Sequence, residues 1–248
     1  MRYVFTVSYD GTDFCGWQVQ PNGRTVQEVM NGAVFKAFGE HATVKASGRT
    51  DAGVHARAQL CQVDLSVVMD GAKLADALNV HLPADVSVLF SRTALPTEDV
   101  QDLVKAKTYR YNMYFGQRRR PLLDRYATWI KGEPNVQMMR EAAEILEGEH
   151  DFKAYCASGS QVKTTVRTVY RIDITEQTIA PDCTSVCIQV YGNGFLYNMV
   201  RTLSGTVLGY SQGRLTQEDL KASLNGDRTR VGKTMPARGL VLYSVETD

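Results

Sequence analysis

The chain is organised around the stretch Ser47-Gly48-Arg49-Thr50-Asp51-Ala52-Gly53-Val54-His55-Ala56. An apolar run at residues 42–46 precedes it and predicts a strand that leads into it. Gly48 and Gly53 permit backbone conformations that a side chain with a Cβ atom disfavours. The pattern therefore predicts a shaped loop at a strand end, which presents Asp51 and Arg49 to one place. A plain turn in which Asp51 caps a helix or closes an Asx-turn is the simpler interpretation.

The composition is that of an ordinary globular chain. Its 248 residues suffice for one large domain or two modest ones. The net charge is only +1, so any signal for nucleic-acid binding must be local. Five cysteines form no Cys-x-x-Cys pair and do not cluster with histidines, which predicts reduced thiols in a cytoplasmic protein without a zinc site. The alternating N-terminus does not resemble a signal peptide, and no apolar run approaches membrane-spanning length.

The first half of the chain is predicted to have the order β-α-β-loop-β-α-β, which is that of a ferredoxin-like split βαβ unit. Thr25 is expected to cap the first helix, with Glu28 completing a capping box, and Gly39 to end it. The periodicity predicts strands at 3–9, 58–65 and 86–90 and helices at 26–38 and 70–78.

The second half repeats this theme loosely, which indicates an internal duplication. A polar, acidic stretch at 94–104 marks the boundary, so the predicted domains are 1–104 and 105–248. The fold class is therefore α+β. The pattern predicts strands at 107–115, 167–175, 184–191 and 239–245 and helices at 136–146 and 198–210.

Several motifs together resemble the tRNA pseudouridine synthase A family over roughly residues 3 to 245. The central stretch carries all seven specified positions of the family's Gly-Arg-Thr-Asp-x-Gly-Val-His pattern. Further matches are Tyr9 and Gly11 with Gly16–Gln20, Ala106–Tyr111, Gly148–Phe152, Gly194–Arg201 and Pro236–Leu240. The resemblance implies two ferredoxin-like halves whose antiparallel sheets join across a central basic cleft. It also implies a homodimer that isomerises uridine to pseudouridine at positions 38, 39 and 40 of the tRNA anticodon stem-loop.

The resemblance also assigns the catalytic residues. It implies that Asp51 is the catalytic carboxylate, that Tyr109 stacks on the target base and that Arg201 pairs with Asp51. A carboxylate can attack C1′ as a nucleophile or remove a proton from C2′ as a base, and the sequence leaves both routes open. The isomerisation involves no redox change and no net addition of water, so no cofactor and no metal are expected.

The expected RNA contacts come from the central loop and from a basic stretch at 105–131. This stretch holds eight cationic side chains against one carboxylate, interleaved with aromatic residues that suit phosphates and exposed bases. Arg49 is expected to enter the space left by a flipped base or to hold its phosphate. The predicted RNA-binding residues are Arg49, His55, Lys107, Arg110, Arg118, Arg119 and Arg120.

One segment departs from the family pattern. The family has Phe-His-Ala-Arg shortly before its Tyr-x-Tyr strand, whereas this chain has Glu98-Asp99-Val100-Gln101. Two acids near an RNA cleft would repel phosphate, where the usual arginine would attract it. Because of this departure, a second interpretation remains, which is a paralogous synthase that acts on another RNA. A non-catalytic RNA-binding protein is a third interpretation, which the intact Asp51, Tyr109 and Arg201 disfavour.

Overall fold

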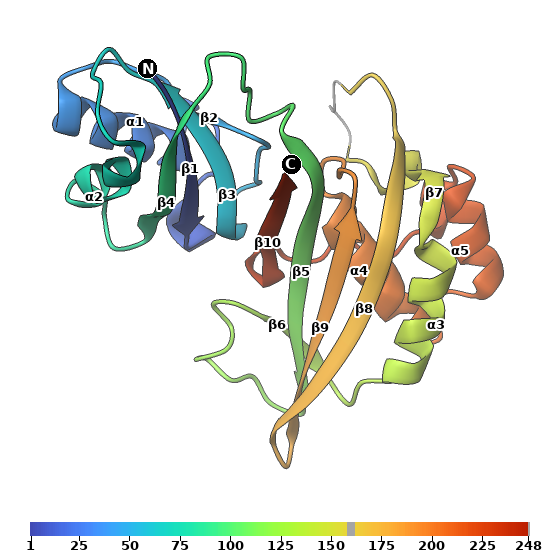
Figure 1. The fold of residues 1–248 in the computed structure, drawn as a ribbon. Coiled ribbons are helices and arrows are strands. Elements are labelled where there is room, and N and C mark those ends of the chain that lie inside the picture. The colour runs from blue at the N-terminus through green and yellow to red at the C-terminus, as the bar shows by residue number, and fades with distance from the viewer. Residues whose placement is uncertain (158–161, 248) are drawn as a thin grey trace. The chain divides into compact units, whose positions relative to one another are not determined.

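The computed structural model describes residues 1–157 and 162–247, and the chain forms two compact units. The first unit is Met1–Lys105 with the segment that begins at Leu242, and the second is Ala106–Val241. The unit boundary adjoins the one predicted after residue 104. The return of the last strand to the first unit is a feature that the sequence pattern does not contain. Both units combine helices with antiparallel strands, so the predicted α+β class is confirmed (Figure 1).

The first unit has the strand order of a ferredoxin-like fold. Its strands follow the order β4-β1-β3-β2, with antiparallel pairing throughout, and β10 (Leu240–Thr247) lies beside β3. Helices α1 and α2 contact each other. The elements are β1 (Arg2–Tyr9), α1 (Val26–Phe38), β2 (Lys45–Ala46), β3 (His55–Asp64), α2 (Leu74–Asn79) and β4 (Val86–Ala94), with 3-10 turns at Gly11–Asp13 and Gly71–Lys73.

Helix α1 has the bounds that the sequence predicts, because its end signals are local. The Thr25 side chain accepts a hydrogen bond from the backbone N–H of Glu28. Gly39 ends the helix in the left-handed conformation at φ 71°. Between these ends, Met30 and Val34 are buried. Loss of a cap of this kind costs about 1 kcal/mol.

Strand β2 is much shorter than the strand predicted over residues 42–46. The backbone N–H of Val44 donates to the Asn31 side chain, at 2.8 Å. The carbonyl of Val44 accepts from the Gln27 side chain, also at 2.8 Å. Helix α1 thereby occupies both backbone groups of Val44, so the ladder with β3 is limited to Lys45 and Ala46.

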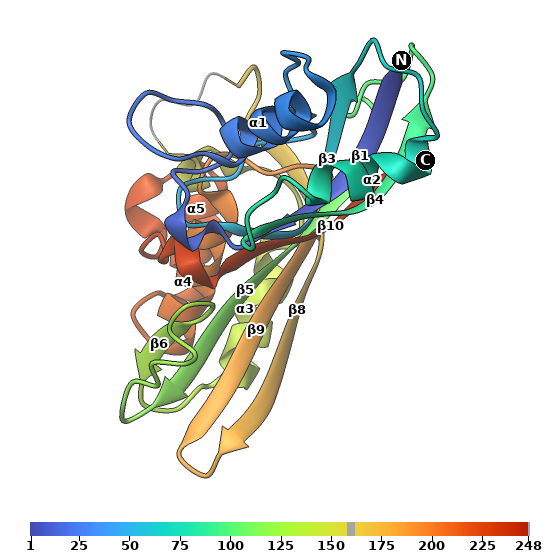
Figure 2. The same cartoon turned by 90° about the vertical axis from the view of Figure 1, so that its left-hand side faces the viewer.

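The second unit is built on four antiparallel strands in the order β5-β9-β8-β7, and β6 adds in parallel to β5. Its strands are β5 (Val104–Gly116), β6 (Thr128–Lys131), β7 (Gly148–Asp151), β8 (Val166–Ala180) and β9 (Cys183–Gly192). Its helices are α3 (Val136–Leu146), α4 (Met199–Ser211) and α5 (Gln217–Leu224), with 3-10 turns at Phe152–Tyr155, Arg228–Arg230 and Ala237–Gly239. Figure 2 shows β8 and β9 as a long hairpin.

Helix α3 packs against α4 and β8, and its apolar stripe is buried as predicted. Three elements were not predicted: β6, β7 and α5. Helix α5 carries a recognisable start signal, because Thr216 and Asp219 form a capping box. Its weak apolar periodicity hides it, since only Leu220 and Ser223 are buried.

Candidate active-site loop and its cationic surroundings

The Asp51 loop is held by the segment that follows β1. The Tyr9 hydroxyl and the Thr50 hydroxyl lie 2.8 Å apart and share a hydrogen bond. The Trp17 N–H donates to the Thr50 carbonyl at 3.1 Å, and the Gly53 N–H donates to the Phe14 carbonyl at 3.1 Å. These bonds fix the backbone on both sides of Asp51. The loop is therefore a preorganised feature and more than a simple turn between strands.

Gly16 lets the two segments approach each other closely. Its φ is +92°, a conformation that residues with a Cβ rarely adopt. A Cβ atom here would lie 2.7 Å from the Thr50 carbonyl oxygen and 3.2 Å from the Asp51 carbonyl carbon. A glycine is therefore required at position 16 for a steric reason, because any side chain here would collide with the backbone of the Asp51 loop.

Gln59 holds the start of the loop by hydrogen bonds. This residue of β3 is 0 % exposed, and its side-chain nitrogen donates to the Gly48 carbonyl at 2.6 Å. The Ser47 hydroxyl donates to its side-chain oxygen at 3.2 Å. Sequence reasoning missed Gln59, although a glutamine at an inward position of an apolar strand signals a polar group that must be bonded.

His55 is directed into the first unit. It is 4 % exposed, and its Nδ1 accepts a hydrogen bond from the Gly11 N–H at 3.0 Å. This geometry leaves the imidazole little surface to offer to RNA. We therefore interpret His55 as a residue that ties the loop to the segment after β1. By contrast, Arg49 is exposed and makes no hydrogen bond or ion pair with residues 1–157 or 162–247.

Tyr109 lies on β5 in the second unit and contacts a second aromatic ring. Its ring meets Phe195 edge to face, with the centroids 5.2 Å apart and the planes at 86°. Phe195 lies in the matched segment that leads into α4. Edge-to-face contact with Phe195 restricts the orientation of the tyrosine ring.

Arg201 is oriented by two groups of its own unit. It lies in the first turn of α4, and its Nε donates to the Met235 carbonyl at 2.7 Å. Its Nη1 donates to the Asn198 side chain at 2.5 Å. Asn198 precedes the helix in the left-handed conformation, at φ 64°. These bonds hold the guanidinium in one direction, so Arg201 is not a freely moving surface cation.

Comparison with known proteins identifies the family. The family model described as tRNA pseudouridine synthase matches residues 6–101 and 142–248. The chain belongs to the tRNA pseudouridine synthase family. It is 37 % identical to tRNA pseudouridine synthase A of Ruminiclostridium cellulolyticum over 99 % of both chains. It is 41 % identical to the Citrifermentans bemidjiense protein of the same name, over 96 % of this chain and 94 % of the relative.

A solved structure is also similar to this family member. It is that of a Cbf5-Nop10-Gar1 complex, at 17 % identity and a TM-score of 0.36, covering 83 % of this chain and 44 % of the other. Within residues 1–157 and 162–247, no group of three or more His, Cys, Asp or Glu side chains could hold a metal ion. The same part of the chain has no helix long and apolar enough to cross a membrane.

The predicted RNA-binding cations of this synthase differ in how far they are neutralised by the protein itself. Arg120 pairs with Asp182 at 2.5 Å, and Arg119 lies 3.6 Å from Asp124. Arg118 is exposed and has no carboxylate partner within the described ranges. Arg118 is therefore the member of this cluster that is most available to a phosphate.

Two further cations lie on β5. Arg110 donates to the Gln189 side chain at 2.8 Å, which directs its guanidinium along the sheet. Lys107 is partly buried, and burial lowers its pKa from the ordinary 10.5 to about 8. The desolvated ammonium of Lys107 would regain stabilisation from a bound anion.

The segment that departs from the family pattern is neutralised internally. Glu98 pairs with Arg92 at 2.9 Å, which holds the Glu98 pKa below its usual range. Asp99 pairs with Lys45 at 2.5 Å, which lowers the Asp99 pKa in the same way. Val100 is 0 % exposed and packs against an apolar cluster. The two acids therefore repel phosphate less than their sequence suggests, because each is matched by a cation.

Proposed function

We propose that this chain isomerises uridine to pseudouridine in tRNA, with Asp51 as the catalytic carboxylate. The observation that carries the proposal is the Asp51 loop itself, whose backbone is fixed by bonds to Phe14, Trp17 and Gln59. A reaction that depends on placing one carboxylate against a ribose carbon benefits from such a preorganised loop. The names of the relatives, all tRNA pseudouridine synthase A, support tRNA as the substrate.

The reaction rearranges bonds without any external reagent. The bond between N1 and C1′ breaks, the base turns, and C5 bonds to C1′. The proton on C5 then leaves and N1 gains a proton, so atoms and electrons balance. Asp51 begins this sequence either by attacking C1′ or by removing a proton from C2′.

The second unit contributes an aromatic ring and a cation to the proposed mechanism. Tyr109, restrained by Phe195, stacks on the detached base and keeps it in place. Arg201, held by Asn198 and Met235, keeps the carboxylate of Asp51 ionised when the base excludes water. The pairing of Arg201 with Asp51 is part of this proposal.

The RNA is held by cations in both units. Arg49 and Arg118 are the exposed cations that we assign to phosphates, and Lys107, Arg110, Arg119 and Arg120 supplement them. The target is the anticodon stem-loop, at positions 38, 39 and 40. The proposal further includes a homodimer, since two-fold pairs are the commonest oligomers. It also places this activity in the cytoplasm.

The test is the Asp51→Ala variant, assayed by tritium release from tRNA labelled at C5 of uridine. We expect no turnover, with tRNA binding and thermal unfolding close to those of the unmodified protein. Asp76→Ala provides a matched control, because Asp76 is an exposed carboxylate on α2. Substantial release by Asp51→Ala would show that another group performs the chemistry.

The alternative substrate is a different RNA, which the Glu98–Gln101 departure motivates. Sequencing of modified sites in tRNA and in total RNA distinguishes the two, because pseudouridine outside positions 38–40 would favour the alternative. If neither RNA pool contains pseudouridine made by the protein, the non-catalytic RNA-binding interpretation holds.

A further inference from the structure

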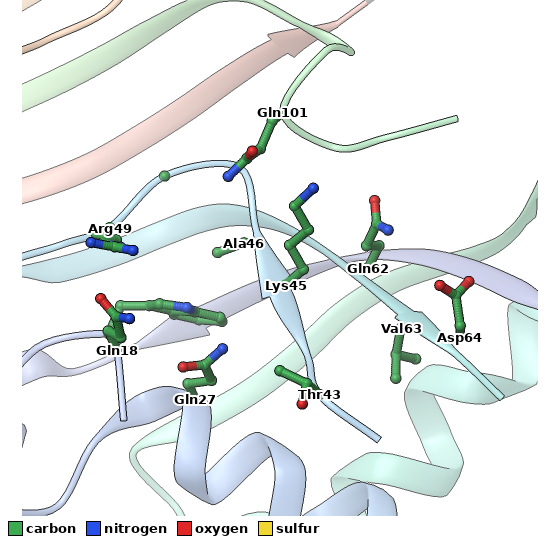
Figure 3. Close-up of a pocket in the computed structure, with 12 residues that line it drawn as sticks. Gln18, Gln27, Thr43, Lys45, Ala46, Arg49, Gln62, Val63, Asp64 and Gln101 are labelled. Atoms are coloured by element: carbon green, nitrogen blue, oxygen red, sulfur yellow. The ribbon is translucent and has the colours of Figure 1, made fainter. Parts of the chain in front are cut away.

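The first unit contains a pocket that is continuous with the Asp51 loop. Its volume is about 430 Å³, and its lining includes Gly48 and Arg49 of that loop. This volume falls in the range of roughly 300 to 1,000 Å³ that is typical of small-molecule sites. Figure 3 shows that Lys45, Gln62 and Gln101 lie on one side of the pocket and Gln18 and Gln27 on the other.

Gln62 supplies an oriented hydrogen-bond donor to this pocket. It is 5 % exposed, and its side-chain oxygen accepts a hydrogen bond from the Val100 N–H at 2.8 Å. This bond identifies the other side-chain atom as the nitrogen, which has no partner in residues 1–157 or 162–247. This nitrogen is not among the enclosed polar atoms that lack a partner, so it reaches the solvent of the pocket. The pocket therefore presents a donor that a ligand with an acceptor atom would satisfy.

The charges around the pocket leave one cation uncompensated. Asp64 is matched by Arg2 at 2.8 Å, and Lys45 is matched by Asp99 at 2.5 Å. Arg49 has no such partner within the described ranges, as noted above. The pocket therefore combines an available guanidinium at the Asp51 loop with the amide nitrogen of Gln62 and the exposed amide of Gln101. This arrangement suits a ligand that carries a phosphate at one end and carbonyl oxygens at the other.

We propose that this pocket binds an unstacked nucleotide of the RNA substrate whose base carries a carbonyl oxygen, which is guanine, uracil or cytosine. Gln62 donates to a base carbonyl, Gln101 adds an adaptable amide, and Arg49 holds the phosphate. RNA is the source of the nucleotide because the pocket and the catalytic carboxylate share one loop, and single-stranded RNA is read by splayed-out bases. This inference rests on the proposed function and extends it, since it assigns a second recognised nucleotide beside the uridine that reacts.

Binding is measurable without turnover. Trp17 lines the pocket, and the only other tryptophan is Trp129, so Trp129→Phe leaves Trp17 as the sole reporter. Titration of this variant with GMP, UMP, CMP and AMP should show saturable fluorescence changes, with AMP binding most weakly because adenine has no carbonyl oxygen. Gln62→Glu keeps the acceptor for Val100 and removes the donor, and should weaken GMP binding about tenfold or more.

Two variants and one inhibition experiment complete the test. Gln101→Ala, at an exposed position, should weaken GMP binding about threefold even if Gln62→Glu folds poorly. Gln177→Glu, on the exposed face of β8, is the control and should leave GMP binding unchanged. GMP should also inhibit pseudouridine formation competitively with tRNA, because both would occupy the pocket.

The outcomes separate this proposal from the proposed function. Asp51→Ala should retain GMP binding while it loses turnover, since Asp51 does not line the pocket. Absence of any nucleotide response in the Trp17 reporter, or unchanged GMP binding in both glutamine variants, would overturn the pocket proposal and leave the isomerase intact. Non-competitive inhibition by GMP would show that the pocket serves a free nucleotide and would overturn the assignment to RNA. A wild-type protein that binds GMP but makes no pseudouridine would instead refute the proposed function.

Discussion

Replacing Lys107 by methionine should stabilise the folded protein at neutral pH while it weakens RNA binding. Burial on β5 lowers the Lys107 pKa from 10.5 to about 8, so at pH 7 the folded chain retains an ammonium in a poorly solvated place. Methionine has a similar length and no charge, and it removes this cost. An anion from RNA would offset the same cost, which is the reason to expect a loss of affinity in the variant.

The size of the effect follows from the two pKa values. At pH 7 the difference between 10.5 and about 8 corresponds to about 3 kcal/mol of lost stability. Because the folded pKa is lowered, the unfolded chain binds more protons between pH 8 and pH 10.5. The penalty therefore shrinks as pH rises through this window, and about 2 kcal/mol remains at pH 9. The advantage of Lys107→Met should thus be smaller at pH 9 than at pH 7.

Urea unfolding at the two pH values measures this difference. Lys131→Met is the matched control, because Lys131 is an exposed lysine at the end of β6 and surface substitutions change stability little. A gain in Lys107→Met that is equal at pH 7 and pH 9 would point to packing and would refute the desolvation argument. A loss of stability at both values would refute it as well.

Four other substitutions test the loop and the cations. Gly16→Ala should lower turnover at least tenfold with little change in tRNA affinity, since the added Cβ atom would meet the Thr50 carbonyl oxygen. Tritium release at the wild-type rate would show that the loop adapts. Asp99→Asn should tighten tRNA binding at low salt, because it releases Lys45 from its ion pair. If the variant and the wild type bind tRNA equally at low and at high salt, this segment lies away from the RNA. Arg118→Gln should weaken tRNA binding and reduce the slope of log affinity against log salt concentration by about 1. Arg120→Gln should have a smaller effect on both, because Asp182 already neutralises Arg120. Equal slopes for the two variants would contradict the difference in pairing.

The sequence by itself determined the features whose causes lie close together in the chain. Helix α1 has its predicted bounds because Thr25 and Gly39 act on backbone groups within a few residues of themselves. Helix α3 was predicted in full because its apolar stripe repeats within eleven residues. The central loop was recognisable for the same reason, since the seven specified residues of its pattern fall within eight consecutive positions, Gly48 to His55.

Only the tertiary structure decided the features that depend on distant partners. The shortening of β2 follows from Asn31 and Gln27, which bond Val44 from a helix. The pairing of Lys45 with Asp99 spans 54 residues, and the bond between Gln62 and Val100 spans 38. No local sequence pattern shows which residues from distant parts of the chain will lie next to these side chains after folding. Such contacts therefore neutralised Asp99 of the departing segment and oriented Gln62 in the pocket, because charge and hydrogen-bond partners are chosen by distance in space.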